Sequence, residues 1–342
     1  VIRVVTPGTN LNIQALDDSK NNYLLCVAYF PGKIGLSVAD VTTGDYYLTE
    51  VEDIRRLQDE INKYAPSEVI CNEQFFVSGY DIEDLKGRLN VSVYSLSPHY
   101  FDEDGCKKTL MRHFRVNTLK GLGIEDFPVG ITAAGALLTY LYETQKTSLS
   151  HMTHIYPYLS SKYMLLDSST RRNLELLETL REKQKKGSLL GVLDRTKTAL
   201  GGRLLRKYIE QPLIDGARIE KRLNAVEELC KRSVDREELR EYLHAIYDLE
   251  RLLGRISYKT ANPRDLIALR NSLAMLPSLR TVLADFDAPL LKEIREHMDP
   301  LEDIHKLIDD AIMEEPPIAV REGGIIREGF NGTIDSLKKA KT

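Results

Sequence analysis

The pattern of hydrophobic and polar positions changes about half-way along the chain. Before that point, three short runs rich in aliphatic and aromatic residues, at 23–30, 33–39 and 45–51, are separated by turns that contain glycine. Runs of this length and spacing predict an antiparallel sheet of three strands. From residue 168 onward, apolar residues instead recur at steps of three and four, which predicts one helix after another. The pattern therefore predicts an α/β part followed by an all-α part.

The α/β part continues beyond these three strands. Apolar residues at helical spacing in 53–64, followed by a short buried run at 67–71, predict a crossover helix that leads to a fourth strand. Three antiparallel strands, a helix and a further strand, in that order, are typical of an RNase H-like fold. Further predictions are a weaker strand at 91–94, a helix at 103–114, a loop at 121–129, a helix at 132–144 that crosses from the first domain to the second, and an extended link at 151–163.

The stretch 171–212 opens the helical part. Leu174, Leu177 and Leu180 recur at three-residue steps behind residues that can cap a helix start, which predicts an amphipathic helix. A second apolar stripe predicts another helix that stops at Pro212, because proline has no backbone N–H to donate. A basic turn separates the two, so the stretch is predicted to be a helical hairpin with its charge on the outside.

Helices are predicted up to the last residue. Asp215 is expected to cap a helix that carries Ile219, Leu223, Val226 and Leu229 on one face. Further helices are predicted at 236–246, 248–256, 264–276, 290–298 and 301–313, with a break at 316–324 and a new helix from 331. Because the first residue is Val1 rather than Met and the last lies inside a predicted helix, we expect a fragment of a larger protein.

Composition narrows the classes of function. The chain of 342 residues is long enough for two domains with cores of their own, and its net charge of -4 gives no support to a dedicated nucleic-acid binder. The four cysteines form no Cys-x-x-Cys pair, which argues against a zinc module or a disulfide framework and is typical of a reducing cytoplasm. No secretory or membrane-spanning run is present, so we expect a soluble, cytoplasmic protein with no membrane partner.

Charge is concentrated locally between residues 171 and 210. Eleven Lys and Arg stand there against five Asp and Glu, a local net charge of +6. The cluster Lys183, Lys185 and Lys186 is the candidate for contacts to a DNA backbone, because lysines neutralise phosphates and release counterions. The alternative, which most charge runs fit, is a solvated turn between helices stabilised by ion pairs.

Candidate chemistry elsewhere is weak. An RNase H-like fold suggests a metal-dependent nuclease, but the first strand has no acid, and Asp40, Asp45 and Glu73 lie near strand ends, where turn chemistry accounts for them. His151 and His154 have a metal-ligand spacing without a nearby acid or cysteine, which favours a surface or linker pair. No segment has the GxxxxGK[ST] pattern of a P-loop. We therefore predict no catalytic, cofactor-binding or metal-binding residue in this chain.

Several motifs resemble, in order and spacing, those of the MutS family of DNA mismatch-repair proteins. The residues that match the opening of its core domain most specifically are Arg171, Arg172, Asn173, Leu174, Glu175, Gly202, Arg203 and Pro212. Further matches are Thr6-Pro7-Gly8-Thr9, Ala133 to Leu138, Gly187 to Leu190, Leu193-Asp194, Leu205, Leu249-Glu250-Arg251, Asn262 to Leu266, and Pro316-Pro317 with Gly323-Gly324. The resemblance covers essentially the whole chain.

The resemblance implies a division into domains. Residues 1–10 would be a leader from a preceding domain, 11–127 an RNase H-like connector domain, 128–158 a connecting helix and linker, and 159–342 an α-helical core domain with the start of a lever helix. It further implies that the Phe-x-Glu mismatch-reading domain, the DNA clamp and the ATPase domain with its ATP and Mg²⁺ lie outside this chain. The parent protein would be a homodimer and a DNA-dependent ATPase, associated with the nucleoid when on DNA, and the fragment a monomer.

The function implied is conformational transmission. The connector would offer a surface to MutL, the core would join the mismatch-binding, clamp and ATPase domains, and duplex DNA would be held mainly by domains absent here. Two alternatives from other classes stay open: an RNase H-like metal-dependent nuclease, and a general helical DNA-binding protein whose binding falls steeply with salt.

Overall fold

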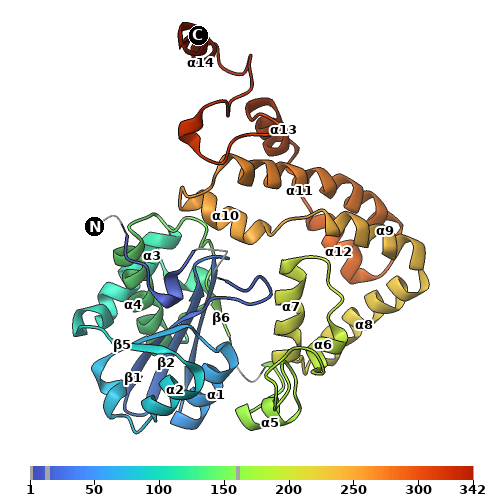
Figure 1. Cartoon of the computed structure of the whole chain (residues 1–342). Coiled ribbons are helices and arrows are strands. Elements are labelled where there is room, and N and C mark those ends of the chain that lie inside the picture. The colour runs from blue at the N-terminus through green and yellow to red at the C-terminus, as the bar shows by residue number, and fades with distance from the viewer. Residues whose placement is uncertain (1–2, 12–15, 159–161, 342) are drawn as a thin grey trace. The chain divides into compact units, whose positions relative to one another are not determined.

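The structure, a computed structural model, describes residues 3–11, 16–158 and 162–341. The chain divides into two compact units, each of which is described by itself below (Figure 1). The α/β unit comprises Val1–Arg195, Gly202–Ile214 and Leu253–Tyr258, and the helical unit comprises Thr196–Gly201, Asp215–Leu252 and Lys259–Thr342. An α/β sheet domain followed by a helical region is thus what the chain forms.

One sheet organises the α/β unit. Strand β1 lies in its middle, antiparallel to β2 and parallel to β4, and β2 is in turn antiparallel to β3. The predicted three-stranded meander is therefore confirmed, as is the fourth strand. The sheet has the order β5-β4-β1-β2-β3-β6, with β1 Leu24–Phe30, β2 Lys33–Asp40, β3 Asp45–Val51, β4 Glu68–Cys71, β5 Ser92–Ser95 and β6 Tyr156–Pro157. Strand β6, parallel to β3, lies inside the predicted extended link.

The helices of the first part are α1 Ile54–Tyr64, α2 Ile82–Leu89, α3 Glu103–Phe114, α4 Pro128–Gln145, α5 Ser168–Asn173, α6 Leu189–Leu193 and α7 Ala199–Glu210, with 3-10 turns η1 Pro7–Thr9, η3 Glu73–Val77, η4 Pro98–Phe101 and η5 Leu119–Leu122. Those that follow are α8 Gly216–Lys231, α9 Ser233–His244, α10 Leu249–Ser257, α11 Pro263–Val282, α12 Pro289–His297, α13 Glu302–Ala311 and α14 Gly332–Lys341, with η7 Leu283–Asp285 and η8 Val320–Glu322.

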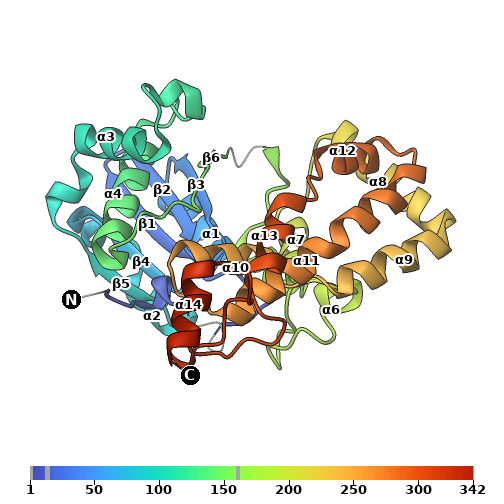
Figure 2. The ribbon, with the colours of Figure 1, turned by 90° about the horizontal axis from the view of Figure 1, so that it is seen from above.

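Both faces of the sheet are covered. Successive side chains of a strand point to opposite faces, so Leu24 and Cys26 pack with α3 and α4 while Leu25 and Val27 pack with α1 and α2. Figure 2 shows the two helix pairs on either side of the strands. The result is a three-layer arrangement with two hydrophobic cores, which is why the central strand is apolar along its whole length.

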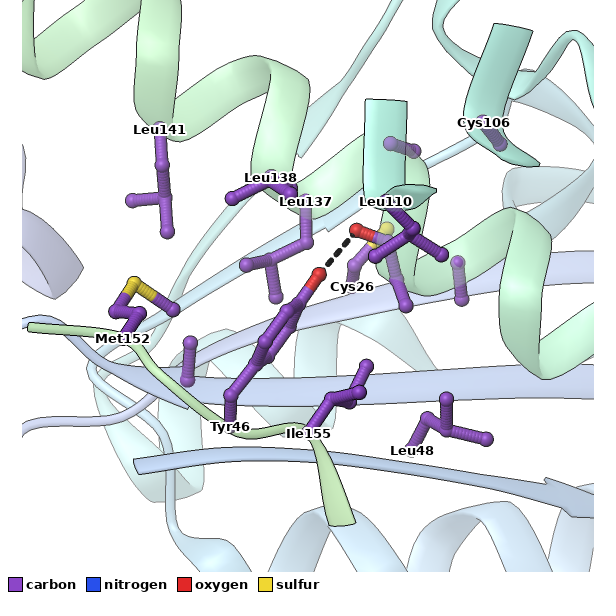
Figure 3. Packing of buried hydrophobic residues seen from close by; sticks show 14 of the residues in the cluster. Cys26, Tyr46, Leu48, Cys106, Leu110, Leu137, Leu138, Leu141, Met152 and Ile155 are labelled. Atoms are coloured by element: carbon purple, nitrogen blue, oxygen red, sulfur yellow. Dashed lines mark hydrogen bonds between the residues drawn. The ribbon is translucent and has the colours of Figure 1, made fainter. Parts of the chain in front are cut away.

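Helix α4 lies in the core of this unit. Leu137, Leu138 and Leu141 are fully buried, and the Tyr46 hydroxyl donates a hydrogen bond of 2.5 Å to the Ala134 carbonyl (Figure 3). A Cβ at Gly135 would lie 2.3 Å from the Cβ of Cys106, so only glycine allows α3 and α4 to pack this closely. The helix predicted at 132–144 is thus confirmed as α4. A helix that is apolar on all sides needs cover on all sides, and the sheet and α3 provide it.

The segment 171–212 also differs from its prediction. Helix α5 ends at Asn173, Leu174 is exposed, and Glu175 takes the left-handed conformation with φ of 49°. The backbone then bonds to residues 189 and 190, which lie further along the chain: the amides of Leu189 and Leu190 donate to the carbonyls of Glu175 and Leu176. The first helix of the predicted hairpin is thus a loop, because these long-range backbone bonds replace the helical ones.

The helical unit follows the predicted helices within a few residues, apart from α11, which runs past Pro277 to Val282. As predicted, Asp215 caps α8 by accepting from the amide of Arg218. The predicted apolar face of α8 is largely exposed, however: Leu223 and Val226 are 60% and 56% exposed. The buried cluster of this unit consists of Ala225, Leu239, Leu279, Leu283, Phe286, Ala288 and Leu291.

Candidate functional site: a polar junction

A cluster of charged and phenolic side chains joins the sheet to residues 162–195 and 202–214 inside the α/β unit. We call it the polar junction, and its members are Tyr47, Glu60, Lys63, Tyr64, Tyr158, Arg171, Lys207 and Glu210. Few buried positions in proteins carry ionisable groups unless these groups are paired. The charged members of the junction are accordingly bonded to one another or to the phenol and carbonyl groups around them.

Helix α1 supplies the first half of the junction. Asp53 caps it, and the helix places Glu60 and Lys63 three residues apart on one side, so their side chains form an ion pair of 3.0 Å. The Tyr158 hydroxyl donates to the same Glu60 oxygen at 2.7 Å. The Lys63 ammonium also lies over two rings, 4.2 Å from the centroid of Tyr158 and 4.8 Å from that of Tyr64.

Helix α5 supplies the second half. Its N-cap Asp167 accepts from the amide of Thr170, which orients the next residue, Arg171, toward the sheet. The Arg171 guanidinium donates from Nε to the Leu166 carbonyl and from Nη2 to the Glu210 carbonyl, both at 3.0 Å. One side chain thereby fixes the start of α5 to the end of α7.

Burial shifts the pKa values of several junction residues toward their neutral forms. Desolvation lowers the pKa of Lys63 and of Arg171, although the carboxylate of Glu60 opposes the shift in Lys63. Desolvation likewise raises the pKa of Glu210, although Arg206, Arg171 and Lys63 favour its charged form. The cluster is thus held together at an electrostatic cost, so its persistence depends on the geometry of all its members.

A second contact ties α7 to strand β3. The Lys207 ammonium donates to the Tyr47 hydroxyl at 2.9 Å and lies 4.6 Å from the ring centroid. The Tyr47 hydroxyl in turn donates to Asp45 at 2.8 Å, and burial together with Asp45 raises the pKa of Tyr47. Each link in this chain orients the next one.

The surface beside the junction has a small cleft, lined in part by Arg56, Lys63 and Arg171 together with Asp59 and Glu210. Its volume of about 40 Å³ is far below the roughly 300–1,000 Å³ of a typical small-molecule site, and its cations and carboxylates are matched. The charged groups around this cleft bond to one another and join the segments that carry them.

Two family models match the chain. MutS domain III matches residues 169–341, and MutS domain II matches residues 22–153. The chain belongs to the MutS family. Among similar proteins, the DNA mismatch repair protein MutS of Lachnoclostridium phytofermentans is 58% identical over 342 residues, 100% of this chain and 37% of that protein. The MutS proteins of Ruminiclostridium cellulolyticum and Caldanaerobacter subterraneus are 45% and 44% identical and are covered over 39% of their length.

Several of the MutS motif residues in 171–212 are buried or form hydrogen bonds. Glu175 accepts from the amide of Leu180, and the Pro212 carbonyl accepts from the amide of Met164. Gly202 and Arg203 are buried, and the Arg203 guanidinium donates to the Asp18 carbonyl at 3.0 Å. The remaining motif residues are Arg171 in the junction, Arg172 and Asn173 at the exposed end of α5, and the exposed Leu174.

The three lysines proposed for DNA contacts are all exposed. Lys185 is paired with Asp194, and Lys183 lies 3.4 Å from Glu178. Lys186 completes the basic turn. The turn is therefore partly neutralised by its own acids, and its contact with DNA stays a prediction.

The other candidates are accounted for locally. Asp40 is buried and accepts from the backbone of Asn22 and from Thr42, while Glu73 is exposed at the start of η3. The ring of His151 bonds to the Val41 carbonyl and that of His154 to Thr153. Over residues 3–11, 16–158 and 162–341, no group of three or more His, Cys, Asp or Glu side chains could hold a metal ion.

One MutS-like tripeptide also has a local explanation. Phe101-Asp102-Glu103 has the Phe-x-Glu pattern that the family's mismatch-reading domain carries. In this chain Asp102 caps α3 by accepting from the amide of Gly105, and Glu103 pairs with Lys107 in its first turn. The tripeptide therefore starts a helix.

Among the described residues, no helix is both long and apolar enough to cross a membrane.

Sequence reasoning missed most of the junction. Glu60 and Lys63 sit beside the apolar stripe of α1, where a charged pair three residues apart is a detectable signal. Tyr158 and Glu210 carry no such signal, because their partners lie far away in sequence. Only Arg171 was named beforehand, through the MutS motif.

Proposed function

We propose that this chain is the connector and core part of a MutS-type DNA mismatch-repair protein. In that role it transmits conformational signals between the mismatch-binding, clamp and ATPase domains of the longer protein. The matches of both family models and the identity to MutS proteins over the whole chain support the proposal. The strand order, with three antiparallel strands followed by parallel ones, is consistent with an RNase H-like connector.

The polar junction is the observation that carries the mechanism. A signal passes between domains only through an element that couples them, and a desolvated charge cluster has few alternative arrangements of equal energy. The links from Tyr47 to Lys207 and from Arg171 to Glu210 join the sheet, α5 and α7 with side-chain bonds of 2.9 and 3.0 Å. A shift of residues 171–210, at the start of the core domain, would thus reach the connector sheet directly.

The test uses a full-length MutS protein that contains this chain. Lys207→Met and Tyr47→Phe each remove the same hydrogen bond, and the double variant completes a cycle that isolates their coupling. We expect each variant to reduce the stimulation of ATP hydrolysis by mismatched over matched DNA about fivefold or more, and the double variant to add little.

Lys108→Met is the matched control, since it removes an exposed lysine on α3, outside both the junction and the basic turn. Mismatch affinity should be the same in all variants, because the mismatch is read elsewhere. Full stimulation in the double variant would contradict the role of the junction.

Partners and cofactors follow from the same proposal. MutL meets the connector, duplex DNA is held mainly by other domains, and ATP with Mg²⁺ belongs to the ATPase domain of the homodimeric parent, so this chain has no cofactor of its own. Crosslinking of the chain to MutL should label residues 11–127. Labelling confined to the helical part would refute the connector assignment, and so would a repeated failure to crosslink.

A further inference from the structure

The amino-terminal turn, residues 6–9, is built into the α/β unit. Its sequence Thr-Pro-Gly-Thr forms η1, in which Thr6 and Thr9 exchange hydrogen bonds as a capping box and proline fixes the first helical position. Gly8 and Thr9 are buried, and Thr9 has no exposed surface. A chain segment that only passed over the surface would not be buried in this way.

A buried carboxylate receives the turn. Glu68, in the internal strand β4, is fully buried and accepts from the amide of Gly8 at 2.9 Å and from the hydroxyl of Tyr140 at 2.7 Å. Both donors are neutral. Burying a carboxylate is costly unless donors satisfy it, so the position of Glu68 favours the conformation that presents the Gly8 amide.

Other contacts hold the residues around this point. The Asn22 amide donates to the Pro7 carbonyl at 3.0 Å, and the Arg3 guanidinium donates to the Thr9 carbonyl at 2.8 Å. The amide of Val4 donates to the Thr144 carbonyl at the end of α4 at 2.8 Å. Residues 3–9 are thereby connected to β4 through Glu68 and to the end of α4 through Thr144.

The turn also fits sterically. A Cβ at Gly8 would lie 2.9 Å from the Cβ of Leu24 and 3.1 Å from both the Cβ and a carboxylate oxygen of Glu68. Backbone and strand therefore approach closely enough that a single methyl group would push them apart. The Gly8 amide reaches the carboxylate only because this space is empty.

We propose that Glu68 is a positioning residue that latches residues 3–9 onto the connector sheet. The chain on the amino-terminal side of Asn10 is then a fixed arm, and a displacement of that arm reaches β4 and α4 through the Glu68 carboxylate. The latch itself rests on geometry alone. Its use as an input for signals from a preceding part of a MutS protein rests on the proposed function.

Hydrogen exchange on the whole chain tests the latch. In Glu68→Ala, the amides of Val4, Gly8 and Thr9 should exchange about tenfold or more faster, because a charge-assisted bond and its dependent contacts are lost. Glu68→Gln keeps one acceptor oxygen and should rescue part of the protection. Tyr140→Phe, which leaves the Gly8 bond intact, should have the smallest effect, and the amides of β1 to β3 should exchange as in the unaltered chain.

A second variant approaches the latch from the other side. Gly8→Ala leaves Glu68 in place and should release the turn by steric conflict, so it decides the question if Glu68→Ala disturbs the sheet. Gly87→Ala is the control, since a Cβ there meets nothing within 4 Å. Unchanged protection of residues 3–9 in both Gly8→Ala and Glu68→Ala would overturn the proposal, as would a loss shared equally by the whole unit.

Failure of the proposed function would look different. In a full-length MutS protein, Gly8→Ala should reduce the stimulation of ATP hydrolysis by mismatched DNA while mismatch affinity is retained. Faster exchange of residues 3–9 with normal stimulation would keep the latch and refute its use as an input. Slow exchange with normal stimulation would refute the latch itself.

Discussion

The α/β unit and the helical unit differ in how completely they bury their apolar residues. In the α/β unit, both faces of the sheet are covered, and side chains such as Leu25 and Leu137 have no exposed surface. In the helical unit, one modest cluster forms around Phe286, while Leu223 and Val226 on α8 stay more than half exposed. Exposed apolar stripes of this kind are typical of surfaces that meet another element. The apolar side chains of the α/β unit are thus buried within that unit, whereas many of those in the helical unit stay exposed.

The largest expected difference between the units concerns truncation of a leucine. Leu137→Ala should lower the free energy of unfolding of the α/β unit by about 2–5 kcal/mol, because it opens a cavity in a core that cannot collapse around it. Leu223→Ala should change the stability of the helical unit by less than about 0.5 kcal/mol. Urea unfolding followed by hydrogen exchange of each unit measures both. Equal losses would remove the contrast between the units.

Overpacking should be nearly as damaging at the crossing of α3 and α4. Gly135→Ala places a methyl group 2.3 Å from the Cβ of Cys106, so the two helices must move apart at an expected cost of about 1–3 kcal/mol. Gly87→Ala in α2 has open space and should be neutral or stabilising by up to about 1 kcal/mol. Thermal unfolding of both variants decides the matter. A stable Gly135→Ala would show that α4 packs less tightly than described.

In the helical unit a partly buried group of charged side chains should also contribute to stability. Arg270 of α11 bonds to Asp309 at 2.9 Å and to Glu314 at 2.6 Å, and its side chain is 9% exposed. Arg270→Met should destabilise α11 by about 1–2 kcal/mol, discounted because both acids face solvent. Lys231→Met is the control, since its ion pair with Glu227 is exposed on both sides. Hydrogen exchange of α11 measures the effect, and no difference between the variants would count against this contribution.

The smallest expected effect is a pH dependence of the α/β unit. Burial lowers the pKa of His113 and of His151, whose rings bond to the Met152 and Val41 carbonyls. The folded state then binds fewer protons than the unfolded state. The contribution of the two histidines to stability is therefore fully present above about pH 6.5 and falls as the pH drops below that value. Between pH 7.5 and 6 the loss should stay under about 1 kcal/mol per histidine.

His151→Gln tests the sign of that dependence. Glutamine keeps a donor for the Val41 carbonyl but takes up no proton, so urea unfolding at several pH values should show a flatter profile in the variant. A profile as steep as that of the unaltered chain would show that His151 does not contribute to it.

The comparison also explains what the sequence could predict. The short apolar runs at 33–39 and 45–51 located strands to within about one residue, because a sheet covered on both faces selects apolar residues along each strand. The helix α4 was predicted, but its place against the sheet and α3 was not, since its Ala and Leu content indicates burial without identifying the partner. The predicted helical hairpin is wrong from Leu174 onward. Apolar spacing favoured a helix there, but backbone bonds from Leu189 and Leu190 take the place of the helical bonds.

Most of the candidate site was beyond prediction for a similar reason. Arg171 was found through a family motif, while Glu60, Tyr158 and Glu210 are brought together from three distant segments. Periodicity describes neighbours along the chain, so it carries no information on such contacts. The DNA contact of Lys183, Lys185 and Lys186 stays a prediction that salt-dependent binding of charge-reversal variants would test.

The interrupted path of the chain has a consequence for biosynthesis. The α/β unit includes Leu253–Tyr258, where a Cβ at Gly254 would lie 2.5 Å from the Thr42 carbonyl and the ring of Tyr258 lies 5.1 Å from that of His151. On the ribosome, the sheet therefore emerges long before its last contact partner does. The contacts of Thr42 and His151 with residues 254–258 can therefore form only after that segment has been synthesised, and α8 and α9 are made before it.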